Sequence, residues 1–228
     1  MKIKNKLAVF LTALLVSFSS SAMAFEGFSI GATYSSADFS TSGKEISRDT
    51  TLVMKETTTS KSGSGDIGSV FLEYTFSQGS TIGIEHISGS AELGKASRTQ
   101  TAAGGGNSGT LTASASIADP TTFYVEPTWM VNDKFGLYVK GGATRVTVQP
   151  KENSDAGGLT SSTYGNKDVW GIMTGIGAKA YYNNFFIKAE YVEREFETYS
   201  FTSTTGDKNT INADVDTEET RVSIGYNF

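Results

Sequence analysis

Eight segments of the chain alternate between apolar residues and polar or small ones. In the last of them, Val222, Ile224 and Tyr226 alternate with Arg221 and Ser223. Successive side chains of a β-strand point to opposite faces, so this period of two predicts strands. The segments cover residues 28–34, 69–76, 82–85, 122–131, 135–143, 170–179, 185–191 and 221–228. The sequence therefore predicts eight strands and an all-β fold.

The connections between these segments are long and short in turn. Tight turns are expected at residues 77–80, 132–134 and 183–184. The long connections cover about residues 37–66, 89–121, 149–167 and 195–216. We expect their tips at Ser42-Gly43, 104–106, 157–158 and 206–207, with strand-like flanks that lengthen the hairpins. This order is typical of outer-membrane barrels, which have short periplasmic turns and long external loops.

Charged residues of the predicted strands lie on the face opposite the apolar one. They are Glu73, Glu85, Glu126, Lys140, Lys179, Lys188, Glu190 and Arg221. If the apolar faces meet lipid, these charges pair inside a narrow lumen, where unpaired charge would be costly. Glycines on the same face then leave room for larger neighbours such as Phe71, Tyr138 and Met173. A soluble sandwich would also alternate, but its wet outer face would not need these glycines.

Aromatic residues gather at both ends of the apolar faces. Tyr74, Phe76, Trp129, Phe135, Phe185, Tyr226 and Phe228 lie near the short turns or the C-terminus, and Tyr34, Phe123, Trp170 and Tyr191 lie near the long connections. Two such groups are expected at the two membrane interfaces. We therefore predict an eight-stranded antiparallel up-and-down transmembrane β-barrel with short periplasmic turns and four long external loops. Pro127 has no N–H to donate, which predicts a bulge or a gap in pairing.

The N-terminus has the pattern of a secretory signal. Lys2, Lys4 and Lys6 precede an apolar run, and small residues follow up to Ala24. The apolar run is shorter than the roughly 20 residues that span a bilayer as a helix. We predict a signal peptide over residues 1–24, Sec-type export, cleavage after Ala24, and one barrel domain over residues 25–228.

Composition narrows the range of partners. Cys is absent, so disulfides play no part. Without the three lysines of the signal, 16 basic residues face 24 acidic ones, which leaves the exported chain at −8. An acidic chain without a basic patch argues against nucleic acid as a partner.

The C-terminal segment, Arg221 to Phe228, resembles the closing strand of bacterial outer-membrane barrels. Val222, Ile224, Tyr226 and the terminal Phe228 match that pattern position by position. The whole exported chain resembles the small outer-membrane β-barrel domains, which include opacity-type proteins and the membrane domain of outer-membrane protein A. The resemblance implies delivery to the bacterial outer membrane and recognition of the strand ending in Phe228 by the barrel-assembly machinery. We expect no added periplasmic domain.

His86 and Ser88 are the residues that most suggest catalysis. They share one strand face, and Glu92 is close enough in sequence to orient the imidazole of a triad. Small outer-membrane lipases such as the lipid A deacylases use a His-x-Ser pair, but within a longer motif late in the chain. Here the pair is early and Gly89-Ser90 follows. The simpler interpretation is a histidine of the girdle, the belt of aromatic residues at the membrane interface, beside a loop serine. We predict no enzymatic activity and no catalytic residues.

Other charged groups suggest surface contacts. Asp214, Asp216, Glu218 and Glu219 could hold a divalent cation, although a solvated charged rim is the simpler interpretation. Glu193, Arg194, Glu195 and Glu197 are interpreted in the same way. Arg48, Lys55, Lys95 and Arg98 are placed to contact lipopolysaccharide phosphates. We predict no metal site and no cofactor.

Three functions remain open from the sequence. The first is a structural or surface-display role, in which the loops contact extracellular surfaces for adhesion or masking. The second is a narrow porin-like channel for small solutes, which a lumen filled by side chains opposes. The third is a lipid-modifying hydrolase built on His86 and Ser88. Outer-membrane lipid and lipopolysaccharide are the expected surroundings in every case.

Overall fold

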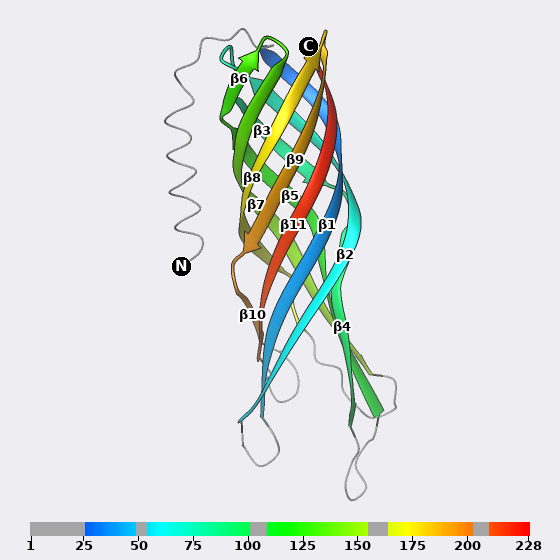
Figure 1. The fold of residues 1–228 in the computed structure, drawn as a ribbon. Coiled ribbons are helices and arrows are strands. Elements are labelled where there is room, and N and C mark those ends of the chain that lie inside the picture. The colour runs from blue at the N-terminus through cyan, green and yellow to red at the C-terminus, as the bar shows by residue number, and fades with distance from the viewer. Residues whose placement is uncertain (1–25, 49–53, 101–108, 155–163, 203–209) are drawn as a thin grey trace, which may run out of the picture.

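The computed structural model describes residues 26–48, 54–100, 109–154, 164–202 and 210–228 (Figure 1). These residues form one antiparallel sheet. Its strands are β1 (Gly27–Arg48), β2 (Met54–Thr75), β3 (Thr81–Ile87), β4 (Ser90–Gln100), β5 (Gly109–Glu126), β6 (Thr128–Asn132), β7 (Phe135–Ser154), β8 (Lys167–Tyr182), β9 (Phe185–Phe196), β10 (Tyr199–Thr202) and β11 (Thr210–Asn227). Among the described residues, no helix is long and apolar enough to cross a membrane.

The eleven strands of the described chain form the wall of a closed barrel. The chain passes along this wall eight times, and we call each passage a stave. Three staves are interrupted, so that β3 continues as β4, β5 as β6, and β9 as β10. The sheet closes because β1 pairs with both β2 and β11, and β5 pairs with both β3 and β7. This confirms the predicted eight-stranded antiparallel barrel. Closure matters in the membrane, where the backbone has no water as an alternative partner. Among the described strands, β6 at the tight-turn end pairs on one side only, with β7.

Tight turns connect the staves at one end of the barrel, the end that also carries the C-terminus (Figure 1). They lie at Ser77–Gly79, Asp133–Lys134 and Asn183–Asn184, as predicted. At the other end the staves continue as long hairpins. The predicted tip at Ser42-Gly43 is wrong, because these residues pair with Ser60 and Thr59 inside a ladder that runs on to Arg48 and Met54. The other three predicted tips lie outside the described residues.

The stave interruptions coincide with residues that disturb a strand. Pro127 separates β5 from β6, as its missing N–H predicts, and its carbonyl accepts from the N–H of Val139 at 3.2 Å. Between β3 and β4, Gly89 has φ +114°, a conformation that side chains with a Cβ rarely adopt. Opposite it, the β5 ladder shifts register between Ala118 and Thr121, and Asp119 has φ 50°. A register shift of this kind bends the strand that carries it and strengthens its twist.

The outward faces carry the residues assigned to lipid. Ile30, Val70, Ile187, Val222 and Ile224 are each more than half exposed, and the predicted aromatic groups also point outward. At the tight-turn end the aromatic rings contact one another edge to face, as Phe28 does with Tyr74 and Phe185 with Tyr226 at centroid distances of 5.0 and 5.1 Å. An apolar exterior with aromatic rings at both limits fits a bilayer.

Candidate functional site

The lumen of the barrel holds a cluster of buried charged side chains, which we call the lumenal plug. It consists of Glu73, Glu85, Glu126, Glu190, Glu219, Lys140, Lys179, Lys188, Arg194 and Arg221, all at most 5% exposed. Each projects inward because it alternates with outward-facing neighbours along its strand. Five acidic and five basic groups balance, so the plug has no net formal charge.

Lys188 lies at the centre of the plug. Its Nζ is 2.6 Å from Oε2 of Glu73 and 2.8 Å from Oε2 of Glu126. Lys140 joins the same network, at 3.0 Å from Glu126 and 2.8 Å from Glu190. The Tyr124 hydroxyl donates to Glu73 at 2.9 Å. Each buried charge of this group therefore has opposite charges within hydrogen-bonding distance, which is the condition for keeping ions out of water.

Two arginines extend the plug toward the long hairpins. Arg221 pairs with Glu85 and lies 3.8 Å from Glu190, and Arg194 pairs with Glu219. The prediction that Arg194 belongs to a solvated rim is therefore wrong, since its side chain points into the lumen and is 3% exposed.

Lys179 extends the plug toward the tight turns. Its Nζ donates to the Gly79 carbonyl at 2.8 Å and to the Thr81 hydroxyl at 3.0 Å. The lysine thereby closes the lumen at the level of the first tight turn.

Inward-facing glycines make the plug possible. A Cβ on Gly83 would lie 2.5 Å from the Tyr124 ring, and one on Gly177 would lie 2.5 Å from the Tyr138 ring. Since these distances are shorter than any van der Waals contact, the rings occupy the space that the missing side chains leave. The predicted exchange of glycines for large lumenal neighbours is confirmed.

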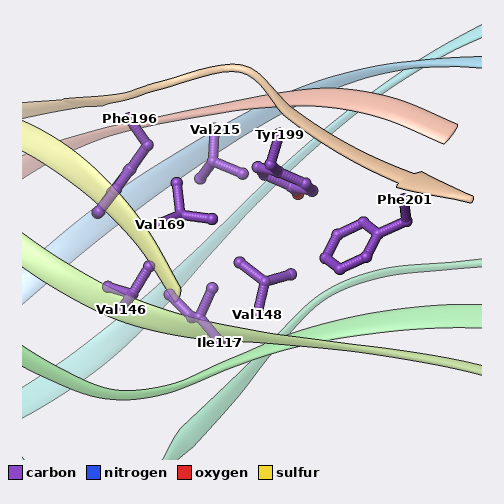
Figure 2. Close-up of a cluster of buried hydrophobic side chains, with 8 residues drawn as sticks. All are labelled: Ile117, Val146, Val148, Val169, Phe196, Tyr199, Phe201 and Val215. Carbon is purple, nitrogen blue, oxygen red and sulfur yellow. The ribbon is translucent and has the colours of Figure 1, made fainter. Parts of the chain in front are cut away.

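Beyond the plug, the external half of the lumen is apolar. Ile117, Val146, Val148, Val169, Phe196, Tyr199, Phe201 and Val215 pack there as one cluster (Figure 2). Burial, and to a smaller extent Asp214, raises the pKa of Tyr199 to about 12, so its hydroxyl stays neutral. A cavity of about 150 Å³ lies where this cluster meets Arg194 and Glu219. Side chains thus occupy the lumen above the plug as well.

This apolar cluster was not predicted from the sequence. Its signal is present as an inversion of the alternation: outside the membrane, the inward positions become apolar and the outward ones polar. On β7, Val146 and Val148 are buried while Arg145 faces outward. On β11, Val215 is buried while Asp216 is exposed. Val215 lies in a predicted connection, and Val146 and Val148 lie between the predicted strand over residues 135–143 and the connection that begins at about residue 149, so their alternation was not used.

His86 lies on the outward face of β3. Its Nδ1 is 3.0 Å from the Thr121 hydroxyl, and its side chain is exposed. Ser88 lies in the interruption between β3 and β4, and Glu92 is exposed on β4. The hydrogen-bond partner of the imidazole is therefore a threonine on the neighbouring stave, while Ser88 lies in the interruption and Glu92 follows on β4.

The acidic cluster near the last hairpin does not share one face. Asp216 and Glu218 are exposed, whereas Glu219 points inward to Arg194. The Tyr191 hydroxyl donates to Glu218 at 3.0 Å. In the described part of the chain, no group of three or more potential ligands is arranged to hold a metal ion. Of the four basic residues assigned to lipopolysaccharide, Lys95 is exposed on β4, and the side chains of Arg48, Lys55 and Arg98 lie outside the description.

Comparisons with known proteins agree with this architecture. The outer membrane protein beta-barrel domain model matches residues 8–228. The outer membrane protein OprG from Pseudomonas aeruginosa is similar in structure, with a TM-score of 0.58 and 15% identity over 91% of this chain and 98% of that one. At this identity the likeness concerns the fold alone. A comparison with curated protein sequences found no match.

Two further solved structures resemble the chain more loosely. The attachment invasion locus protein Ail of Yersinia pestis covers 86% of this chain and 99% of its own, with 14% identity and a TM-score of 0.33. The outer membrane protease OmpT from Escherichia coli covers 88% and 97%, with 8% identity and a TM-score of 0.42. At these scores neither structure carries an argument about function.

Proposed function

The chain belongs to the outer membrane protein beta-barrel domain family, and from that premise we propose that it is a non-conducting, non-catalytic barrel with a structural and surface-display role. The family places it in the bacterial outer membrane. The observation that supports the proposal is the lumenal plug, whose ten buried charged side chains occupy the lumen. Nine of them form ion pairs, and Lys179 donates to the Gly79 carbonyl and the Thr81 hydroxyl. Side chains that fill a narrow eight-stranded lumen oppose the passage of solutes, which supports a non-conducting barrel.

The long hairpins supply the surface that would be displayed. In the first hairpin, β1 and β2 remain paired from Asp38, just beyond the outer aromatic group, to Arg48. The ten intervals between these eleven residues correspond to about 33 Å at ~3.3 Å per residue. Outward positions there, such as Ser40 and Ser62, are polar and exposed. A rigid, hydrated ladder of this length reaches well past the lipid headgroups and supports contact with external surfaces.

Shortening this hairpin tests the display role without removing any of the membrane-spanning barrel. Thr41 pairs with Lys61, so replacing residues 42–60 by Asn-Gly preserves the register and closes the ladder with a favoured two-residue turn. The shortened barrel is expected to keep its heat-dependent shift in gel mobility, while cells that carry it adhere less to a protein-coated surface. Equal adhesion of cells with the full and the shortened chain would contradict the display role.

Electrical recording distinguishes a channel for small solutes from the display role. Purified protein in a planar bilayer is expected to give no discrete conductance steps. Reproducible steps whose size changes when Lys188 or one of its partners is replaced would support conduction instead of display.

The absence of catalysis is part of the proposal. The outward position of His86 and its contact with Thr121 support a girdle role. Lipid A from cells that overexpress the protein is expected to keep its acyl chains. Their loss, abolished by His86→Ala, would establish the hydrolase instead.

Export and assembly complete the proposal. We expect cleavage after Ala24, recognition of the strand ending in Phe228 by the assembly machinery, and contact of exposed Lys95 with lipopolysaccharide phosphates. Intact mass of the outer-membrane form tests the cleavage site. Removal of Phe228 is expected to leave the chain outside the membrane fraction.

A further inference from the structure

The lipid-facing wall of the barrel contains a hollow of about 690 Å³. Two neighbouring rows of outward residues line it across six strands, and the inward residues that alternate with them, Glu73, Gly83, Tyr124, Gly142 and Met173, complete its lining. One row is made by Phe28, Tyr74, Ile82, Val125, Gly141 and Thr174, which are successive cross-strand partners from β1 to β8. The adjacent row runs from Leu72 to Ile172. A closed barrel is convex, so a groove along its rows needs a local cause.

Small residues at one end of the two rows explain why the convex wall has a groove there. Gly141 and Ala143 lie next to each other on the outer face of β7, and larger side chains surround them. Val125 is the partner of Gly141, and Phe123 and Ile172 flank Ala143. Phe123 is 55% exposed and stands out from the wall. Missing side-chain volume between such neighbours leaves a groove with apolar walls.

The groove climbs through one half of the bilayer. Tyr74 lies three residues before Ser77 of the first tight turn, whereas Thr174 lies nine residues before Asn183 of the third. Five steps between strands amount to about 24 Å at ~4.8 Å each. The strands tilt by about 40° from the membrane normal, so a row that crosses them is inclined by the same angle to the membrane plane. Over its length the row therefore rises ~15 Å along the normal, half of the ~30 Å hydrocarbon core. The groove therefore has the depth of the periplasmic leaflet.

A carboxylate lies at the periplasmic end of the groove. The Tyr74 hydroxyl donates to Oε1 of Glu26 at 3.2 Å, and Glu26 is exposed. Phe28 packs edge to face on Tyr74 and fixes this end of the groove. A carboxylate at headgroup level attracts an ammonium group and repels a bare phosphate.

We propose that the groove seats one acyl chain of a phospholipid from the periplasmic leaflet, with Glu26 contacting an ammonium headgroup. The apolar walls and the depth of one leaflet suit an acyl chain. The negative charge of Glu26 at the periplasmic end favours a headgroup with an ammonium group. This lipid site is separate from the display role and rests only on the orientation of the barrel in the membrane.

Native mass spectrometry of the folded, exported protein tests the site, with phosphatidylethanolamine and phosphatidylglycerol of identical acyl chains as probes. The wild type is expected to retain one phosphatidylethanolamine in preference to phosphatidylglycerol. Ala143→Phe fills the groove and should lower the bound fraction at least fivefold. Ala189→Phe is the matched control, since Ala189 is an exposed, outward residue on β9 between Ala178 and Val222. Glu26→Gln should make the two lipids equivalent.

Three results would overturn the proposal. Equal lipid retention by Ala143→Phe and Ala189→Phe would show that the groove is not a seat. Equal retention of the two phospholipids by the wild type would remove the headgroup contact. Retention of lipid A, or a dimer dissociated by Ala143→Phe, would assign a different occupant. Thr174→Phe blocks the same groove and replaces Ala143→Phe if that variant lacks the gel-mobility shift of a folded barrel.

Discussion

Replacing Lys188 by Met is the most direct test of the lumenal plug. The ammonium group lies 2.6 Å from Glu73 and 2.8 Å from Glu126, and its side chain is 2% exposed. Met has a similar length and no charge, so the change leaves the packing and removes the ion. Glu126 keeps Lys140 at 3.0 Å, whereas Glu73 keeps the hydrogen bond from the Tyr124 hydroxyl at 2.9 Å. The plug is then left with one negative charge in excess.

The expected cost follows from that imbalance. Removing one partner of a buried ion pair destabilises by about 3–5 kcal/mol, because the remaining charge is desolvated without compensation. With m-values of about 1–3 kcal/mol per molar urea, the unfolding midpoint should fall by at least ~1 M. Equilibrium unfolding in phospholipid vesicles, followed by gel mobility without boiling, measures this change.

Two further variants make the test decisive. Lys188→Met combined with Glu73→Gln restores neutrality and should recover a large part of the lost stability, since the excess charge is gone. Lys134→Met removes an exposed lysine from the second tight turn and should change stability by less than about 0.5 kcal/mol. If Lys188→Met costs no more than Lys134→Met, the plug does not hold its charges in the dry lumen described above.

Three more predictions follow from the same structure. Ile224→Arg places a charge on the lipid-facing wall and should cost about 2–4 kcal/mol in vesicle unfolding, whereas Ser64→Arg on the first hairpin should cost almost nothing; equal costs would contradict the facing assignment. Gly177→Ala brings a Cβ within 2.5 Å of the Tyr138 ring and should destabilise by about 1–3 kcal/mol, while Gly63→Ala meets nothing within 4 Å and serves as the control. Wild-type protein in a planar bilayer should show no discrete conductance steps, and such steps would contradict a filled lumen.

The membrane-spanning half of the barrel was predictable because two solvents act on it. Lipid outside and a narrow lumen inside demand opposite residues at successive positions, so Ile187, Lys188 and Ala189 identify their faces without any knowledge of the fold. The partners of the buried charges were not predictable in the same way. Lys188 on β9 pairs with Glu73 on β2, across the lumen. Such a pair depends on how the sheet closes, which no local pattern contains.

The length of the hairpins was underestimated for a different physical reason. Ser42 and Gly43 favour turns, and the residues around them are polar on both faces, so no alternation marks a strand. In the structure, Ser42 pairs with Asp214 on one side and with Ser60 on the other. Backbone ladders on both sides of β1 therefore outweigh the local turn preference.

The inversion of the alternation gives the level of the membrane surface from side-chain chemistry alone. On β7, Leu137, Val139 and Ala143 face outward below the level of Arg145, and Val146 faces inward above it. The outside changes from lipid to water there, so the apolar face must turn from the outside to the inside to remain dry. Arg145 lies opposite Trp170 of the outer aromatic group. Two independent signals, an aromatic ring at an interface and a reversal of polarity, thus agree on one level. Above that level the barrel holds itself together as a water-soluble protein does, by an apolar interior, and below it by the paired charges of its plug.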